Sequence, residues 1–440
     1  MKKFFRSALF WTHLAAGIIA GVVIAIMSFT GAALAFEKEL IAWAERDIRR
    51  VAPPSPDAAP LPFDELARRA REAKPDFSPA SIAIDADPSA PLTLAAAGRG
   101  APVYYQNQYT GELIPRGAPG MRAFMGAMFA WHRWLGLEGD QRAAGKAVTG
   151  ACNLAFAFLA VSGLYLWWPR NWTWKGLRPS TIILANLRGR ARDWNWHNAI
   201  GFWTAPVLIV LTLTAVPISY AWGNRLVYTL FGEEAPTRPG PPPAPEKPPL
   251  AVTPPAPGAR PLDADALVAR AQGQLDGWEQ ITLRLPSGTQ ARRGGAGQPA
   301  AGNPAGESRA QARPPRERPD ANTAGAAPQP VTLTVREASR WPRTATVQAH
   351  FDPYTGDLLR RDEFGDNTPA RRFRIWTRFL HTGEALGWPG QLVAGLASLV
   401  SLVLCYTGFA LTWRRFFCKK KAPPPPVAKT QRPETAKAAG

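Results

Sequence analysis

Cysteine is scarce in this chain of 440 residues, and several motifs built on cysteine or glycine are missing. The three cysteines, Cys152, Cys405 and Cys418, have neither metal-site nor disulfide spacing. No Cys-x-x-Cys-His occurs, which excludes a covalently attached c-type haem, and no Gly-x-Gly-x-x-Gly follows a predicted strand. Disulfides and a nucleotide-binding domain are therefore not expected.

Acidic residues are also few, with 33 Asp and Glu against 52 Lys and Arg, so that the formal net charge is +19. Such a charge can indicate nucleic-acid binding, but no basic helix here alternates with stacking aromatic residues. Much of the charge instead flanks long apolar segments. We therefore expect the positive charge to meet an anionic membrane surface, and we expect no nucleic-acid partner.

Apolar residues, 46% of the chain, gather in four stretches at roughly 8–36, 147–168, 199–222 and 391–413. About 20 apolar residues cross the ~30 Å hydrocarbon core of a bilayer, so each stretch predicts a transmembrane helix. The first stretch contains Ala33-Leu34-Ala35, which resembles a cleavage site, but its apolar run exceeds the ~7–15 residues of a signal peptide. We expect it to remain as an uncleaved span.

The short basic flanks predict the orientation of the chain. Lysines and arginines lie at the start, in the loop 169–198 and in the tail 414–440, which share one side if the chain crosses four times. Both termini are therefore expected in the cytoplasm. The long regions 37–146 and 223–390 then lie outside, and their arginines do not oppose this because long loops translocate largely regardless of charge.

Four of the five histidines stand at the ends of the apolar stretches and alternate between the two sides. His13 and His197 open the first and third stretches on the cytoplasmic side, whereas His132 and His381 precede the second and fourth on the outer side. A single intramembrane histidine can simply bond a neighbouring helix. Four placed symmetrically favour two pairs of axial ligands, because two imidazoles from different helices hold an electron-transfer haem.

An internal duplication supports this pairing. Tyr-Thr-Gly turns occur at 109–111 and 354–356, and each is followed by an aromatic stretch, a histidine and a span. Those spans end alike, in SGLYLWW at 162–168 and TGFALTW at 407–413, and aligning His13 with His197 places Thr30 on Thr214. Each half thus reads as inner histidine, span, outer region, outer histidine and returning span.

The outer regions predict α+β structure. Residues 61–70 and 262–271 are amphipathic with acidic residues in the first turn, which is typical of helices. Alternating segments at 81–84, 280–285 and 331–335 predict strands, and the Tyr-Thr-Gly turns predict hairpins with glycine at positive φ. The composition of 235–258 and 291–330 predicts disorder.

The four-span layout, the paired turns and the ending SGLYLWWPR after an HRWLG segment resemble the PepSY-associated transmembrane family. The resemblance covers nearly the whole chain apart from the two disordered stretches and the tail. That family includes bacterial inner-membrane proteins of iron uptake, among them haem-bearing reductases that release iron from siderophores in the periplasm. The motifs are more specific for the family than for the substrate. The resemblance implies a multi-pass protein of the bacterial inner membrane.

The predicted fold class is a mainly α membrane protein, with four transmembrane helices as two repeated halves and two small periplasmic PepSY-like α+β modules. The predicted division of the chain is cytoplasmic start and helix 1, 1–36; first periplasmic module and interfacial helix, 37–146; helix 2, 147–168; cytoplasmic loop, 169–198; helix 3, 199–222; second periplasmic module with a disordered insert near 291–330, 223–390; helix 4, 391–413; and disordered cytoplasmic tail, 414–440.

Residue pattern and resemblance together predict two b-type haems per chain, one held by His13 and His197 and one by His132 and His381. Three arginines near these histidines could pair with haem propionates through bidentate hydrogen bonds, although anchoring at the membrane interface explains them equally well. They are Arg133 and Arg378 outside and Arg192 inside. His350, in an outer module, is expected to be an ordinary surface or core histidine.

The predicted activity is reduction of a periplasmic ferric siderophore with release of Fe(II), by electrons from a separate, unidentified cytoplasmic or membrane donor. No catalytic residues beyond the haem ligands are expected. Candidate substrate contacts are the outer aromatic residues Tyr104, Tyr105, Tyr109, Trp376 and Trp388. Two alternatives stay open. One is a general cytochrome b subunit that serves a protein partner, and the other is a non-enzymatic PepSY regulator on a membrane anchor, which would hold no haem.

Overall fold

The computed structural model describes residues 2–418 except 56, 98–101, 170–171, 237–247, 249, 251, 253–255, 257–258, 286–328 and 339–344. The stretch predicted to be disordered at 291–330 lies outside the described residues except for its last two. Most of the stretch 235–258 and the tail from 419 onward also lie outside them.

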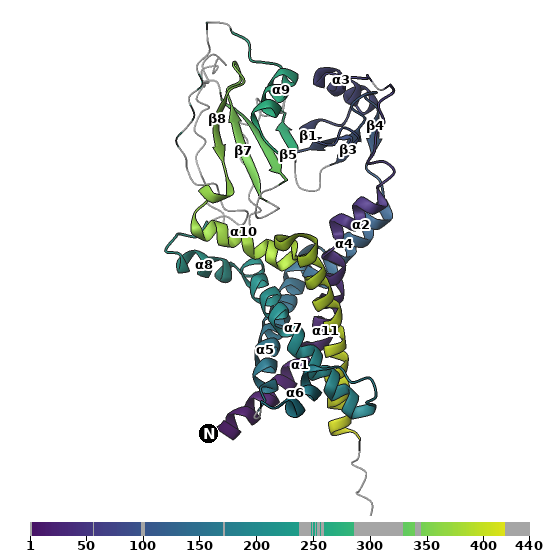
Figure 1. The fold of residues 1–440 in the computed structure, drawn as a ribbon, viewed down its shortest axis with the longest axis vertical. Coiled ribbons are helices and arrows are strands. Elements are labelled where there is room, and N and C mark those ends of the chain that lie inside the picture. Colours follow the sequence, from purple (N-terminus) through teal and green to yellow (C-terminus); the bar gives the residue numbers. More distant parts are fainter. Residues whose placement is uncertain are drawn as a thin grey trace, which may run out of the picture.

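Four long helices form a bundle (Figure 1). They are α1 (Lys2–Leu34), α5 (Arg142–Trp167), α7 (Gly189–Ser219) and α11 (Gly387–Phe416). All four are long and apolar enough to cross a membrane, which confirms the prediction of four such helices. Helices α1 and α7 each pack on both α5 and α11, so α1 and α7 stand at opposite corners of the bundle.

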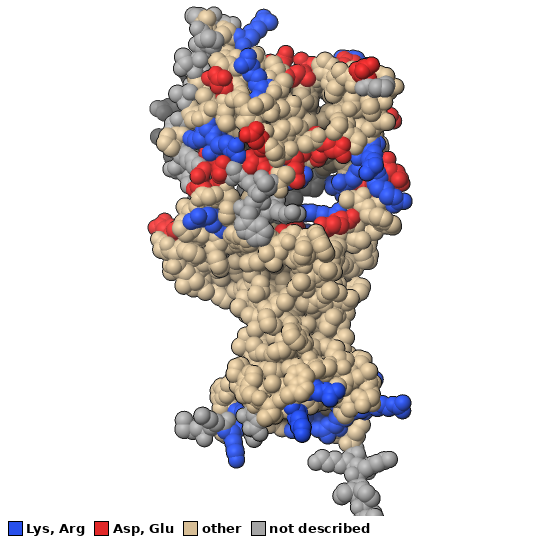
Figure 2. Space-filling view, viewed as in Figure 1, with Lys and Arg blue, Asp and Glu red and all other residues tan. Residues whose placement is uncertain are grey.

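Small residues let the four helices approach closely. A Cβ atom on Gly21 of α1 would lie 2.7 Å from the ring of Phe409 of α11, so only glycine leaves room for that ring. Large apolar side chains such as Ile19 and Leu213 are exposed on the outside of the bundle instead. On the visible face of the bundle, Figure 2 shows a belt without charged residues. An apolar exterior of this kind suits contact with lipid.

Shorter helices flank the bundle. They are α2 (Glu37–Ala44), α4 (Pro119–Trp134), α6 (Trp174–Thr181), α8 (Ala221–Leu230), α10 (Pro369–Thr382) and the 3₁₀ turns Gly139–Gln141, Phe364–Asp366 and Glu384–Leu386. Helix α4 packs on α1 and α5, and α10 packs on α7 and α8. Both therefore lie at the end of the bundle that faces the strands (Figure 1), which we call the sheet end.

The opposite end of the bundle, which we call the basic end, contains the N-terminus and the end of α11 (Figure 1). On the visible face of this end Figure 2 shows Lys and Arg but no Asp or Glu. Among its basic residues are Arg6, Lys175, Arg188, Arg190 and Arg414. The charge asymmetry that the sequence predicts is thus present in the folded chain.

Eight antiparallel strands form one sheet in the order β4-β3-β2-β1-β5-β6-β7-β8. Their bounds are β1 Pro79–Asp85, β2 Leu92–Ala96, β3 Val103–Gln106, β4 Leu113–Pro115, β5 Trp278–Arg284, β6 Val331–Glu337, β7 Thr346–Phe351 and β8 Leu358–Asp362. Strand β1 pairs with β5, with Ile82 opposite Leu283, which joins the two outer regions. Two separate modules were expected, whereas the strands share one sheet.

The two outer regions also share one hydrophobic core. Helices α3 (Phe63–Ala73) and α9 (Ala264–Gln274) contribute Leu66 and Leu267, which pack with strand residues such as Ile281. The carboxylate of Asp265 on α9 accepts hydrogen bonds from the backbone N–H of Phe63, at 3.0 Å. The regions therefore fold against each other and form one unit above the bundle.

The two Tyr-Thr-Gly turns have the same geometry. Gly111 and Gly356 have φ values of 72° and 73°, and their N–H groups donate to the carbonyls of Asn107 and Asp352. A Cβ atom on Gly111 would also collide with the side chain of Arg69. Glycine is required at both turns for its positive φ, as the sequence predicts.

Candidate functional site

The two outer histidines meet at the sheet end of the bundle. His132 near the end of α4 and His381 near the end of α10 have ring centroids 6.3 Å apart, with their planes inclined by 51°. Tight turns hold both helix ends against the bundle. Leu135 and Gly136 follow α4 at positive φ, and Gly383 follows α10 at a φ of 77°, where a Cβ would clash with the backbone of α11.

Backbone carbonyls fix the orientation of these two rings. The Nδ1 of His132 lies 3.0 Å from the carbonyl oxygen of Met27 on α1, and the Nδ1 of His381 lies 2.9 Å from that of Leu211 on α7. A carbonyl only accepts, so Nδ1 must carry the proton that it donates. The Nε2 atom of each neutral ring then bears a free lone pair, which is what metal ligation requires.

The two inner histidines are oriented in the same way, but by hydroxyl groups. The Nδ1 of His13 lies 2.8 Å from Ser162 Oγ, and the Nδ1 of His197 lies 3.0 Å from Thr407 Oγ1. Each hydroxyl also lies within hydrogen-bond distance of a carbonyl of its own helix, Ser162 of that of Phe158 at 2.6 Å. With its hydrogen on that carbonyl, the hydroxyl accepts from Nδ1–H of the histidine. Within the described chain no hydrogen bond to Nε2 of these four histidines is found.

The two histidine pairs lie at different heights in the bundle, and equivalent positions of α1 and α7 set the distance between them. Met27 follows His13 by 14 residues and Leu211 follows His197 by 14 residues (27 − 13 and 211 − 197). At 1.5 Å per residue this spacing corresponds to about 21 Å along each helix. His13 and His197 lie on the diagonal helices, and they contact Ser162 and Thr407, which hold corresponding positions near the ends of α5 and α11. The bundle therefore presents one histidine pair toward the basic end and one at the sheet end.

The helices that carry His13 and His197 are longer than the apolar stretches predict. Helix α1 begins at Lys2 and α7 at Gly189, so His13 and His197 stand more than one turn inside these helices. The polar residues before each histidine extend the helix beyond the apolar run. Sequence hydropathy alone could not detect this extension, because it detects only the apolar part of a helix.

Glycines lie against three of the four rings. A Cβ atom on Gly31 would lie 3.2 Å from Cε1 of His132, one on Gly163 would lie 3.3 Å from Cε1 of His13, and one on Gly408 would lie 3.7 Å from Cε1 of His197. The missing side chains let the imidazoles pack directly against a neighbouring helix. Gly163 follows Ser162 and Gly408 follows Thr407. At each inner histidine, two consecutive residues therefore supply both the hydroxyl that bonds the ring and the glycine that leaves room for it.

The residues present would suit a group held between two imidazoles. At the sheet end His132 and His381 would hold it, since their ring centroids lie 6.3 Å apart. No group of three or more His, Cys, Asp or Glu side chains suited to a metal ion occurs in the described ranges. Two ligands alone suit a metal that arrives with its own equatorial nitrogens, as haem iron does.

The three candidate arginines differ in their surroundings. Arg133 and Arg378 each lie 5.8 Å from a phenylalanine ring, and neither has an acidic partner among the residues that the structure describes. Burial lowers the pKa of the Arg133 guanidinium. Arg192 is bound instead to the fully buried carboxylate of Asp193, at 2.8 Å. Two of the three thus remain available to an anionic group at the outer site.

Some functional features were not predicted. Ser162 and Thr407 stood in the repeated span endings, but only helix packing reveals that they orient His13 and His197. Asp193 accepts from both Arg192 and Arg414, and thereby joins the start of α7 to the end of α11. Asp193 is an acidic residue within an otherwise basic flank, and this contrast in the sequence could have indicated its role.

Two candidate substrate contacts have structural roles. Tyr104 packs on Phe77 with ring centroids 4.6 Å apart, and Tyr105 donates its hydroxyl to Glu45 Oε2 at 2.9 Å. Tyr105 is buried, and Tyr104 packs against the core of the sheet. Trp388, by contrast, is exposed at the start of α11.

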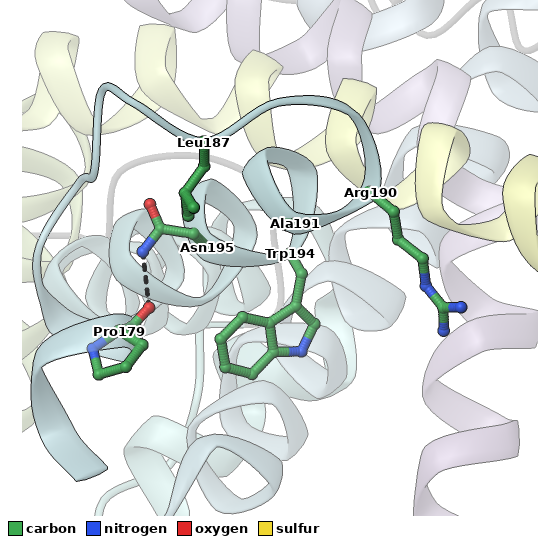
Figure 3. A pocket seen from close by; sticks show the side chains of 6 residues that line it. All are labelled: Pro179, Leu187, Arg190, Ala191, Trp194 and Asn195. Atoms are coloured by element: carbon green, nitrogen blue, oxygen red, sulfur yellow. Dashed lines mark hydrogen bonds between the residues drawn. The ribbon is translucent and has the colours of Figure 1, made fainter. Parts of the chain in front are cut away.

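A shallow pocket lies at the basic end, where α6 and the following loop meet α7 (Figure 3). It is lined by Pro179, Leu187, Arg190, Ala191, Trp194 and Asn195. The amide of Asn195 donates to the carbonyl of Pro179 at 2.6 Å and so holds the loop in place. The pocket lies just before His197 in the chain, with Arg190 as its charged residue.

Four apolar helices below a single outer sheet define a multi-span membrane protein. Residues 10–415 match the family model described as the PepSY-associated TM region. The chain therefore belongs to the PepSY-associated transmembrane family, as its motifs indicate. No curated protein matches the chain.

Proposed function

We propose that this protein is a di-haem b reductase that carries electrons across the bacterial inner membrane to a ferric siderophore in the periplasm. The observation that carries the proposal is the common hydrogen-bond pattern of the four histidines. His13, His132, His197 and His381 each spend Nδ1 on a neighbouring helix and leave the lone pair of Nε2 free. Histidines that served only to join helices would have no reason to bond through the same ring nitrogen.

The four histidines would serve as axial ligands in two pairs, and a bound haem supplies an iron that alternates between Fe(III) and Fe(II). Helices α1 and α7 would contribute His13 and His197, while α4 and α10 would contribute His132 and His381. We interpret the matched spacing of 14 residues in α1 and α7 as the product of a duplicated half. Arg133 and Arg378 would bind propionate groups at the outer site.

The charge distribution supports the proposed direction. The basic end would face the cytoplasm, because positive residues in short flanks are retained there, and the sheet would lie in the periplasm. The two histidine levels are about 21 Å apart along the helices, so a flat cofactor at each level would leave a shorter gap between cofactor edges. The pocket before His197 would lie on the side of the electron donor.

The substrate step needs no acid or base from the protein. Fe(III) held by the oxygen donors of a siderophore accepts one electron and becomes Fe(II), and the siderophore is released with its ligand atoms unchanged. Hard oxygen ligands hold Fe(II) less tightly because its charge is lower. The protein's task is thus to bring the ferric complex near the outer histidine pair.

The proposal is tested by reducing the purified protein, removing excess reductant and adding a ferric hydroxamate siderophore under anaerobic conditions. We expect the haem spectrum to reoxidise while a colorimetric chelator captures Fe(II) in equal amount. His350→Gln is the matched control, since His350 lies in the sheet between Thr332 and Asp362 and should not change the result. Protein that stays reduced in the presence of ferric siderophore, but passes electrons to a protein acceptor, would favour a general cytochrome b subunit.

A further inference from the structure

Helix α8 packs on α10, the helix that carries His381, at the sheet end of the bundle (Figure 1). Phe231 after α8 and Phe373 of α10 have ring centroids 5.6 Å apart. Glu233 closes the start of α10, because its carboxylate accepts from the hydroxyl of Thr368 at 2.6 Å and from the N–H of Ala370 at 3.1 Å. This carboxylate is therefore already committed to the helix start.

Hydrogen-bond donors without acceptors gather between these two helices. The hydroxyl of Tyr228 on α8 and the Nε and Nη1 atoms of Arg371 on α10 are buried and have no hydrogen-bond partner among the described residues. Tyr228 is only 3% exposed. Arg374 donates to Asn224, which lies one turn before Tyr228 on α8, and Arg371 lies one turn before Arg374 on α10. Because α8 packs on α10, the three side chains belong to one contact region.

Arg374 has only neutral hydrogen-bond partners among the residues that the structure describes, and the nearby carboxylate of Glu233 is bound to the start of α10. Arg374 donates to Asn224 Oδ1 at 2.7 Å and to Thr377 Oγ1 at 3.3 Å, but neither oxygen carries a charge. In the part of the chain that the structure describes, no ion pair involves Arg371 or Arg374. Burial lowers the pKa of both guanidinium groups and raises that of the Tyr228 hydroxyl. Buried donors and unpaired charge cost free energy unless an acceptor arrives.

The missing acceptor should be an oxyanion. Guanidinium groups present paired N–H donors that match the oxygens of a phosphate, and a phenol adds one more donor. The surroundings are apolar and exposed, as α8 and α10 present Trp222, Leu226, Leu230, Phe231 and Phe373 to the outside. A free phosphate would gain nothing from these side chains, whereas the acyl chains of a lipid would cover them.

We propose that Tyr228, Arg371 and Arg374 bind the phosphate of an anionic phospholipid, whose acyl chains lie along the exposed apolar residues of α8 and α10. The position at the sheet end of an apolar bundle is where a headgroup of the outer leaflet would lie. His381 stands seven residues after Arg374 on α10, on the same helix face. The bound lipid would therefore hold the helix that carries an outer histidine, and this inference does not depend on haem.

The test measures lipid binding to the delipidated full chain by native mass spectrometry. Phosphatidylglycerol, phosphatidylcholine and inorganic phosphate serve as separate probes. We expect phosphatidylglycerol to be retained most strongly, and Arg371→Gln to weaken it about tenfold because a charge-assisted hydrogen bond is lost. Arg372→Gln, which changes the exposed neighbouring arginine, should bind like the wild type.

Tyr228→Phe keeps the inference testable if Arg371→Gln folds poorly. The Tyr228 hydroxyl has no hydrogen-bond partner among the described residues, so its removal should leave the melting temperature of the delipidated protein unchanged while it weakens phosphatidylglycerol binding. Equal binding of phosphatidylcholine would overturn the proposal. So would inorganic phosphate that displaces the lipid completely, or an Arg372→Gln variant as impaired as Arg371→Gln.

Discussion

Nδ1 of His197 on α7 lies 3.0 Å from Oγ1 of Thr407 on α11, and the same hydroxyl oxygen lies 2.7 Å from the carbonyl oxygen of Val403. With its hydrogen on that carbonyl, Thr407 accepts from Nδ1–H and favours the tautomer of His197 with a free Nε2 lone pair. Ser162 of α5 has the same relation to His13 of α1. Both inner histidines are thus held by a neighbouring helix in a form suited to metal ligation.

Removal of this hydroxyl should loosen the inner haem. In Thr407→Val the Nδ1 of His197 loses its acceptor, and the loss of such a partner of a metal-bound histidine weakens binding roughly 10–100-fold. The measurement is the rate at which apomyoglobin withdraws haem from the purified protein. Thr412→Val is the control, because among the described residues Thr412 bonds only the carbonyl of Gly408 on its own helix. Equal rates in the two variants would contradict a role for Thr407 in ligand orientation.

A side chain at Gly31 should displace His132. In Gly31→Val the new Cβ would start 3.2 Å from the imidazole Cε1, and its methyl groups would require the ring to move. We expect loss or distortion of the outer haem alone, seen in the electron paramagnetic resonance spectrum. Gly126→Val is matched to it, since nothing lies within 4 Å of a Cβ at Gly126. The idea fails if the outer signal is unaltered in Gly31→Val.

Glu45 joins the outer sheet to the helix that carries His132. Its fully buried carboxylate accepts from Arg122 of α4, from Arg49 at 3.0 Å and from the Tyr105 hydroxyl of β3 at 2.9 Å. Glu45→Gln leaves these guanidinium groups without a charged partner, so we expect a loss of about 3 kcal/mol in unfolding free energy. The partly exposed pair of Glu65 with Arg69 gives the control Glu65→Gln, for which the change should be small.

The same carboxylate predicts a pH dependence. Burial raises the pKa of Glu45, but hydrogen bonds from Arg122, Tyr105 and Arg49 outweigh it and hold the pKa below its usual value of 4.5. A group with a lowered folded pKa contributes stability above its unfolded pKa and loses it as the pH falls through the folded value. The melting temperature of the wild type should therefore fall more than that of Glu45→Gln between about pH 6 and about pH 3. Parallel curves for the two proteins would refute this.

The sequence predicted the parts of the site that depend on local pattern. Apolar length predicted four spans, duplication predicted which histidines pair at the outer end, and Gly111 and Gly356 predicted two turns at positive φ. These features follow from residue type and spacing alone.

Features that depend on packing between distant segments could not be predicted. The carbonyls of Met27 and Leu211 orient two histidines, but every residue has a carbonyl, so only the helix register selects these. Likewise, nothing in β1 or β5 alone specifies that they pair and merge two expected modules into one sheet. The unpaired donors of Tyr228 and Arg371 also become evident only once α8 lies on α10.

The most direct test of the account is a reduced-minus-oxidised visible spectrum of the purified protein, with haem quantified per chain. The account predicts two b-type haems in the wild type and in His350→Gln. It predicts one in His13→Ala, which removes an inner ligand, and one in His381→Ala, which removes an outer ligand. A colourless protein from cells well supplied with haem would contradict the account, and so would a haem content that neither substitution changes.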